Sequence, residues 1–190
     1  EYALNRKQGK STIQNKHGTI IDHADVRRML ISMRADIFAS RSIELENAKA
    51  IDMANATGEP EWINKAAFLT PITKVFGTEI GINISNLGVQ IHGGMGFIEE
   101  TGAAQFSRDV RVTAIYEGTN GIQAMDLVGR KMMDNGETAY AIINQIKEYI
   151  DNLSGVKKDL SGLLGLANET LRETVEYLIS KTEVSDRFGG

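Results

Sequence analysis

The sequence has no cysteine, so disulfides and thiolate chemistry are excluded, and the redox compartment is left open. Only two of the 190 residues are proline, aromatic residues are 6% of the chain, and strand-like alternation is scarce. No apolar run approaches the ~18 residues of a membrane-spanning helix. The net charge of −4 gives no electrostatic reason to expect nucleic acid or an anionic membrane as a partner. We therefore expect an all-α protein that binds neither.

The beginning of the chain indicates a piece of a longer protein. It starts with Glu-Tyr-Ala rather than Met, and nothing there resembles a signal peptide, so we expect a cytoplasmic location. Residues 1–7 are typical of the last turns of a helix that is already under way. A polar loop is predicted over residues 10–18, where Ser, Thr, Asn and Lys dominate.

Two long helices are predicted next. The first begins at a cap formed by Asp22 or Asp25 and ends near Ala56. Its inward stripe comprises Val26, Met29, Leu30, Met33 and Ile37. The second covers roughly residues 60–87. Pro71 is expected to divide it, with Thr70 as the cap of the buried part and residues 62–69 as a separate short helix.

Shorter elements are predicted after the second helix. Thr101 is expected to cap a short helix that reaches Asp109, and residues 110–116 are expected to be extended or irregular. Thr119 or Asn120 is expected to cap the helix after that. Arg108 and Asp109 are interpreted as a structural ion pair.

The last part of the chain reads as two amphipathic helices. A turn at residues 134–136, with the sequence Asp-Asn-Gly, precedes them. We expect the two helices to be antiparallel, with these apolar residues facing inward: Ile142, Ile143, Ile146, Tyr149, Ile150 and Leu153 on the first, and Leu160, Leu164, Ala167, Leu171, Val175 and Leu178 on the second.

Residues 90–123 carry the features that indicate chemistry. Two glycines, Gly93 and Gly94, follow the second long helix, where they would either end it or let the backbone approach a ligand closely. Glu117 stands in a turn just before a helix start, where it would be either a base or a first-turn carboxylate favoured by the helix dipole. Spacing alone leaves both alternatives open.

Three motifs in this stretch carry a family resemblance. They are Gln90-Ile91-His92-Gly93-Gly94-Met95-Gly96-Phe97, then Arg108-Asp109, then Ile115-Tyr116-Glu117-Gly118-Thr119. In this order and spacing they resemble the C-terminal domain of acyl-CoA dehydrogenases, flavoenzymes that desaturate acyl-CoA thioesters. The long tail and the Gly-Lys-Ser stretch near residue 10 resemble the branch with an extra C-terminal helical region, which includes dehydrogenases of methylthiopropanoyl-CoA.

The resemblance implies a fold and a domain division. Residues 1–133 would form the up-and-down helical bundle of the C-terminal domain, with its first helix truncated. Residues 134–190 would form an appended and incomplete helical extension. The flavin-binding β-domain is missing from these residues, so the resemblance implies that this chain alone is inactive.

The resemblance also implies roles in catalysis. Glu117 would remove the α proton of the thioester while hydride passes to flavin N5, and Tyr116 and Gly118 would lie at the substrate. A carboxylate removes so weakly acidic a proton only where it is shielded from water. Ile115 and Tyr116 are expected to supply that apolar cover.

The resemblance assigns FAD contacts to eight residues. The glycines would meet the ADP half of an FAD that belongs to a neighbouring subunit, and an arginine fork would bind its pyrophosphate. His23 is as well explained as an exposed helix-cap residue. The sequence departs from the family by lacking a Phe after Gln8 and by having Gly121 where Gln is usual. The eight residues are Arg6, Gln8, His23, Gln90, Gly93, Gly94, Thr119 and Asn120.

The implied partners are an acyl-CoA substrate, a second or further copy of the chain in a homodimer or homotetramer, and electron-transfer flavoprotein as the electron acceptor. No metal is expected, since the three histidines lack ligand spacing. Two alternatives remain open, namely an acyl-CoA oxidase of the same fold and a non-catalytic helical oligomerisation domain.

Overall fold

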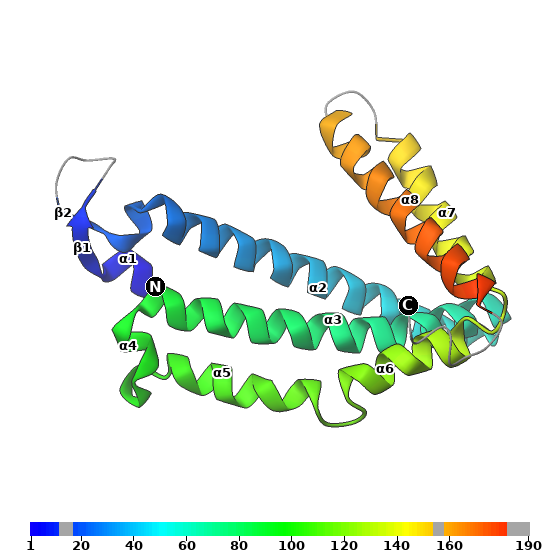
Figure 1. Ribbon diagram of the computed structural model, residues 1–190, viewed down its shortest axis with the longest axis horizontal. Helices are drawn as coiled ribbons and strands as arrows, with labels where there is room; N and C mark the ends of the chain where they lie inside the picture. The colour runs from blue at the N-terminus through cyan, green and yellow to red at the C-terminus, as the bar shows by residue number, and fades with distance from the viewer. Residues whose placement is uncertain (12–16, 154–157, 182–190) are drawn as a thin grey trace. The chain divides into compact units, whose positions relative to one another are not determined.

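The computed structural model describes residues 1–11, 17–153 and 158–181. These group into two compact units, one made of Glu1–Glu46 and Thr73–Asn120, the other of Asn47–Ile72 and Gly121–Gly190. Helices dominate both units, so the all-α prediction is confirmed (Figure 1). Within the described residues, none of the helices is both long and apolar enough to cross a membrane.

The N-terminal segment contains a small antiparallel hairpin that the sequence did not predict. Helix α1 covers only Tyr2–Asn5, and the strands are β1, Lys7–Lys10, and β2, His17–Thr19. The predicted loop is therefore wrong at its two ends, while its middle lies outside the described residues. The strands approach closely because Gly18 has no side chain: a Cβ there would lie 2.5 Å from that of the buried Ser11.

Helix α2, Ala24–Thr57, follows the short 3₁₀ helix η1, Ile20–Asp22, and confirms the first long helix. The helix begins directly after His23, whose carbonyl accepts a hydrogen bond from the Arg27 amide at 3.1 Å. Asp25 lies inside the first turn, where it pairs with Arg28 at 2.8 Å, so it is not the cap. The predicted stripe faces inward as far as Met33, whereas Ile37 is exposed. The core of the first unit comprises Ala3, Ile20, Met29 and Ile91, with Val26, Leu30, Met33 and Leu87 packed against it.

Helix α3, Pro60–His92, is one continuous helix, so the predicted break at Pro71 is wrong. The Pro71 side chain is fully buried, and this burial offsets the backbone hydrogen bond that proline cannot make. Thr70 does not cap a new helix, because its hydroxyl donates to the Ala66 carbonyl one turn back, at 2.8 Å. Gly93, with φ of 60°, ends the helix as predicted.

Helix α5, Ala103–Arg111, runs antiparallel to the last turns of α3. The Ser107 hydroxyl donates to Asn86 Oδ1 at 2.9 Å, and a Cβ on Gly81 would lie 2.8 Å from Val110. The predicted cap is wrong, since Gly102 occupies that position and the Thr101 hydroxyl lies 2.5 Å from the Met95 carbonyl instead. The short elements on either side of α5 are α4, Gly94–Phe97, η2, Glu99–Thr101, and η3, Val112–Ala114. The last replaces part of the predicted extended segment with a 3₁₀ turn.

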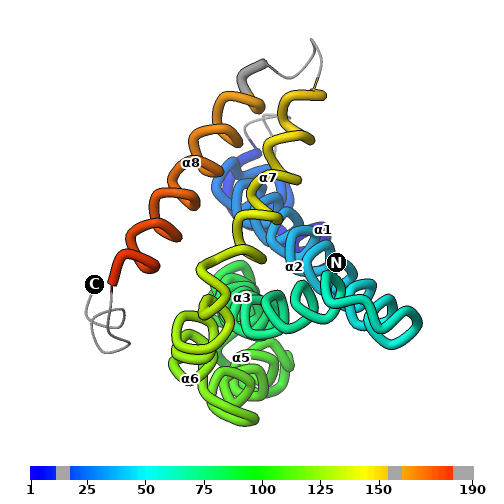
Figure 2. The backbone as a smooth tube through the Cα atoms, turned by 90° about the vertical axis from the view of Figure 1, so that its right-hand side faces the viewer, coloured from blue at the N-terminus to red at the C-terminus, as the bar shows by residue number. Residues whose placement is uncertain are grey.

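The second unit is built around a helical hairpin. Helix α6, Asn120–Asp126, continues into a π-helical stretch, η4, Leu127–Lys131. The predicted turn is confirmed: the Asp134 carboxylate accepts hydrogen bonds from the amides of Gly136 and Thr138. Helices α7, Glu137–Asp151, and α8, Lys158–Ser180, then pack side by side and antiparallel, as predicted (Figure 2). The buried core of this unit comprises Phe68, Leu69, Met132, Ala139, Ile143 and Val175.

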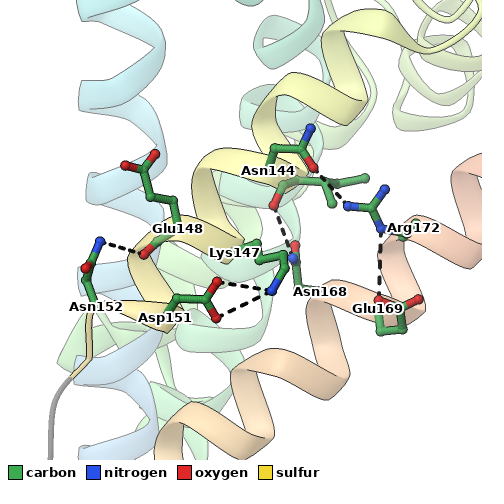
Figure 3. A network of polar contacts seen from close by, with 9 residues as sticks. Asn144, Lys147, Glu148, Asp151, Asn152, Asn168, Glu169 and Arg172 are labelled. Atoms are coloured by element: carbon green, nitrogen blue, oxygen red, sulfur yellow. Dashed lines mark hydrogen bonds and ion pairs between the residues drawn. The ribbon is translucent and has the colours of Figure 1, made fainter.

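Polar contacts connect the two hairpin helices (Figure 3). The buried Asn168 donates to the Ile143 carbonyl at 3.1 Å, and Arg172 donates to Asn144 Oδ1 at 2.9 Å. The predicted inward stripe is only partly right. Tyr149, Leu160, Ala167 and Leu171 are exposed, since two packed helices bury one narrow seam and leave the flanking positions uncovered.

Candidate functional site

The N-terminal segment is held against the C-terminal end of α3. The Tyr2 hydroxyl donates to the His92 carbonyl at 3.2 Å, and the two rings are in contact, with centroids 4.2 Å apart and planes tilted by 30°. The Ile20 amide donates to the Arg6 carbonyl at 2.8 Å, which ties β2 and η1 back to α1. The hairpin therefore lies beside the glycine motif that follows α3, although some 80 residues separate them in the sequence.

A cavity of about 420 Å³ lies between these segments, and we call it the hairpin cavity. Its wall includes five of the residues predicted to bind FAD: Arg6, Gln8, His23, Gln90 and Gly93. Sequence reasoning missed the rest of the wall, notably Tyr2, Asp25 and His92. Two of the missed residues, Val26 and Met29, had been predicted only as part of the buried apolar stripe of α2.

The donors in the wall suit an anionic ligand. Arg6, Gln8 and Gln90 are exposed, so their side chains are accessible to a ligand. A Cβ built on Gly93 or on Gly94 would meet nothing within 4 Å, so the backbone there faces open space. A guanidinium, two amides and a bare glycine turn fit the phosphate part of a dinucleotide such as FAD.

His23 also has a task inside the chain. Its Nε2 donates to the Gln8 carbonyl at 2.9 Å, and its ring lies 3.2 Å from the position of a Cβ on Gly9, where φ is +75°. The histidine thereby fixes β1 to the start of α2. Glycine is needed at position 9 both for the left-handed backbone and for the space that the ring occupies.

The turn that carries Glu117 has an unusual backbone. Glu117 has φ of 51° and Gly118 has φ of 85°, two consecutive left-handed residues. Positive φ is uncommon for glutamate and persists only where the surrounding structure holds it. On the N-terminal side, the Val112 carbonyl accepts hydrogen bonds from the amides of Ile115 and Tyr116 at 2.9 and 3.1 Å.

Glu117 is exposed in this chain. Its expected apolar cover is also exposed, since Ile115 is 52% and Tyr116 is 50% accessible. The prediction that these two side chains bury the carboxylate is therefore wrong for the described residues taken by themselves. Gly118 is partly buried and Thr119 is exposed in the same turn.

Asn120 attaches the turn to α3. Its Oδ1 accepts a hydrogen bond from Lys74 Nζ at 2.8 Å and lies 3.2 Å from the Thr78 hydroxyl. Its Nδ2 donates to Glu79 Oε1 at 2.7 Å. Both ends of the amide are thus engaged by one face of α3, and Gly121 beyond it is exposed.

The predicted residues fall into two separate groups on α3. The Glu117 turn is attached at Lys74–Glu79, whereas the hairpin cavity is at Gln90–Gly93. At 1.5 Å of rise per residue, the twelve residues between Thr78 and Gln90 place the groups about 18 Å apart along the helix. Gly94, Thr119 and Asn120 are not part of the cavity wall.

A larger hollow of about 940 Å³ lies between α3, η2 and α5, and its wall contains none of the predicted site residues. The predicted pair of Arg108 with Asp109 is wrong, because neighbouring helical residues point in different directions. Arg108 pairs with Glu99 at 3.6 Å, while Asp109 accepts a hydrogen bond from Gln105. We regard the smaller hairpin cavity as the candidate site, since five of the predicted site residues line it.

Comparison with known proteins gives the family. The family model described as "Acyl-CoA dehydrogenase, C-terminal domain" matches residues 2–133. The chain is 52% identical to 3-methylmercaptopropionyl-CoA dehydrogenase of Ruegeria pomeroyi over 124 residues, which cover 63% of this chain and 21% of that protein. It is 33% identical to a butyryl-CoA dehydrogenase of Syntrophomonas wolfei over 159 residues, which cover 80% of this chain and 26% of that protein.

A solved structure named "Bd2924 apo-form" matches with a TM-score of 0.69 over 95% of this chain and 37% of its own, at 23% identity, and supports the fold alone. The chain spans only about a fifth to a quarter of the two curated relatives. Because the family model covers more than half of the chain, the protein belongs to the acyl-CoA dehydrogenase family and carries its C-terminal domain.

Proposed function

We propose that the chain is the C-terminal part of an FAD-dependent acyl-CoA dehydrogenase with Glu117 as its base. The α C–H bond breaks and its proton passes to the Glu117 carboxylate. Bound FAD would accept the β hydrogen as hydride, so the two electrons leave the substrate and a carbon–carbon double bond forms. The observation that carries this proposal is the left-handed turn of Glu117, a costly backbone shape at the end of a family motif.

The environment of Glu117 supports its being part of a larger site. A base for this reaction needs shelter from water, and the described residues leave it exposed. About three quarters or more of each curated relative lies outside the matched part, so the shelter would come from the substrate and from the rest of the protein. Tyr116 and Gly118 would then lie along the bound thioester.

The hairpin cavity is proposed to hold the ADP half of an FAD bound to a neighbouring subunit. Arg6 would pair with the pyrophosphate, with Gln8, Gln90, Gly93 and the adjoining Gly94 around it. His23 would adjoin the same group through its remaining ring atoms. The cavity and Glu117 lie about 18 Å apart along α3, and the family resemblance assigns them to two different active sites.

Thr119 would contact the flavin of the chain's own active site. For Asn120, the side-chain bonds to α3 leave only its backbone or its second amide hydrogen for such a contact.

The remaining assignments follow the family. Residues 1–133 would be the bundle domain, a division that the family match over residues 2–133 supports, and residues 134–190 its helical extension. The substrate would be an acyl-CoA, the assembly a homodimer or homotetramer in the cytoplasm, and the electron acceptor electron-transfer flavoprotein. The curated relatives are named dehydrogenases, which favours this activity over that of an oxidase.

Glu117→Gln in the full-length enzyme tests the base. The amide keeps the shape and removes the proton acceptor, so kcat should fall by ~10²–10⁴ or more while flavin stays bound. The matched control is Glu176→Gln on the exposed surface of α8, which should keep parental kcat. Near-parental turnover of acyl-CoA by Glu117→Gln would show that another group is the base.

A further inference from the structure

We propose that Lys74, Asn120 and Glu79 form a clamp that positions Glu117 for proton removal. The inference rests on the proposed function, because it assumes that Glu117 is the base. None of the three side chains needs to touch the reacting carbon, so each is a positioning residue. The clamp comprises two hydrogen bonds: the Lys74 ammonium donates to Asn120 Oδ1, and Asn120 Nδ2 donates to Glu79 Oε1.

The geometry of the clamp is that of a crosslink between two segments far apart in sequence. Lys74 and Glu79 lie 46 and 41 residues before Asn120, both on α3. The two bonds measure 2.8 and 2.7 Å and each pairs a charged group with the neutral amide. Hydrogen bonds to charged groups are stronger than those between neutral ones. A single asparagine is thus held at its oxygen and at its nitrogen.

The clamp lies directly after the turn that carries Glu117. Asn120 stands three residues after Glu117, and the left-handed Gly118 lies between them. On the other side, Tyr116 is anchored to the Val112 carbonyl. The strained turn is therefore fixed at both ends, by η3 before it and by α3 after it. Strain of this kind persists only where the surrounding contacts hold it.

Lys74 has a feature that separates it from an ordinary surface lysine. It is half-buried, its ammonium is 2.8 Å from a side chain 46 residues away, and Thr78, one turn further, lies 3.2 Å from the same oxygen. Residues four apart share one helix face, so this face of α3 presents two groups to one acceptor. Removing the ammonium should let the turn relax without emptying a core.

Lys74→Met in the full-length enzyme removes the donor and keeps the length of the side chain. A misplacement of about 1 Å at a reacting group costs ~10²-fold, so we expect kcat to fall by about 10- to 100-fold with the flavin content and KM unchanged. The primary isotope effect with substrate deuterated at the α-carbon should rise, because proton removal becomes slower relative to other steps. A simple loss of folded enzyme would lower kcat and leave that isotope effect unchanged.

Lys65→Met is the matched control. It removes a lysine bond of the same type from the same helix, since Lys65 Nζ donates to Gln145 at 3.3 Å. Its kcat and isotope effect should equal those of the parent. Equal losses in Lys65→Met and Lys74→Met would overturn the clamp in favour of a general effect on α3.

An exchange of partners gives a second and independent test. Asn120→Asp keeps the acceptor for Lys74 but sets a carboxylate against Glu79, and we expect about a tenfold loss of kcat. Glu79→Gln alone keeps an acceptor for Asn120 but removes its charge, so we expect a loss of kcat that is smaller than the loss in Asn120→Asp. In the double variant Asn120→Asp with Glu79→Gln, the new amide at position 79 can donate to the new carboxylate at position 120. This variant should recover most of the kcat that Asn120→Asp loses. No recovery would overturn the clamp.

A readout without turnover completes the test. Amide hydrogen exchange of the peptide over residues 112–126 should be faster in Lys74→Met than in the parent or in Lys65→Met, in the protein with and without flavin. Suppose that Glu117→Gln is inactive, while Lys74→Met changes neither the hydrogen exchange nor the isotope effect. The clamp proposal would then be wrong, and Glu117 would still be the base. If Glu117→Gln turns over normally, the proposed function fails first, and exchange alone decides whether the clamp holds the turn.

Discussion

The hairpin cavity and the Glu117 turn differ in how much of each site this chain supplies. Three segments build the cavity, with Met29 and Ile91 from the buried core behind it and exposed donors at its rim. The turn is one short segment whose Glu117 is exposed, and Asn120 attaches it to α3. A surface that receives an anionic group can be formed by one domain, whereas a base that must be dry needs walls from elsewhere.

The largest effect at the cavity is expected from Arg6→Met. Charge-assisted hydrogen bonds contribute ~1.5–3 kcal/mol and ~1.4 kcal/mol is tenfold, so FAD affinity should fall by about 10- to 100-fold. Equilibrium titration of the flavin-free full-length enzyme measures this. Excess FAD should restore kcat, which it cannot do for Glu117→Gln, and this difference separates the two regions.

Arg41→Met is the control for the loss of an arginine. Arg41 is exposed on α2 and is absent from the cavity wall, so FAD affinity should not change. A parental affinity in Arg6→Met would remove the cavity from the flavin site.

Gly94→Val should have a smaller effect and tests how far the flavin surface extends. A Cβ at Gly94 meets nothing in this chain, so the fold should accept valine, while a ligand that covers the turn would meet its methyl groups. We expect about a tenfold loss of affinity, comparable to one strong hydrogen bond. The control is Gly162→Val on α8, whose Cβ also enters open space. Full flavin content in Gly94→Val would indicate that the two glycines only end α3 and do not contact the flavin.

The smallest effect is expected from Gln90→Leu. A neutral hydrogen bond contributes ~0.5–1.5 kcal/mol, so affinity should fall by about two- to tenfold. Thermal unfolding should not change, since Gln90 is exposed. A loss larger than that of Arg6→Met would mean that the amide, rather than the guanidinium, is the main anchor.

The sequence predicted the elements that depend on local signals. The start of the α2 stripe, the glycine stop after His92 and the Asp134 turn were correctly predicted, because periodicity and turn residues act within a few positions. It failed where distant contacts decide. Pro71 lies inside a helix with its side chain fully buried, and burial of that kind leaves no pattern in the chain. The hairpin was missed although Gly18 and Ser11, which meet in it, are close in sequence.

In the candidate site, too, the sequence predicted single residues but not the contacts between distant segments. Motif residues such as Glu117 and Gly93 could be singled out, but their surroundings could not. Nothing in the sequence indicated that Lys74 and Glu79 hold Asn120, since more than 40 residues separate them. The exposure of Glu117 was also unexpected, because apolar neighbours in sequence do not have to fold over a side chain in space.

Subunit mixing tests the central claim most directly, namely that the cavity serves a neighbouring subunit while Glu117 serves its own. Full-length Glu117→Gln and Arg6→Met proteins are unfolded together and refolded as a 1:1 mixture. In a symmetric dimer, half of the molecules are hybrids, and each hybrid then has one site with an intact base and an intact cavity. We predict recovery of about a quarter of parental activity at limiting FAD, where Glu117→Gln alone is nearly inactive and Arg6→Met alone retains at most about a tenth. A mixture no more active than the average of its two components would contradict the account, because it would place the cavity and the base in the same active site.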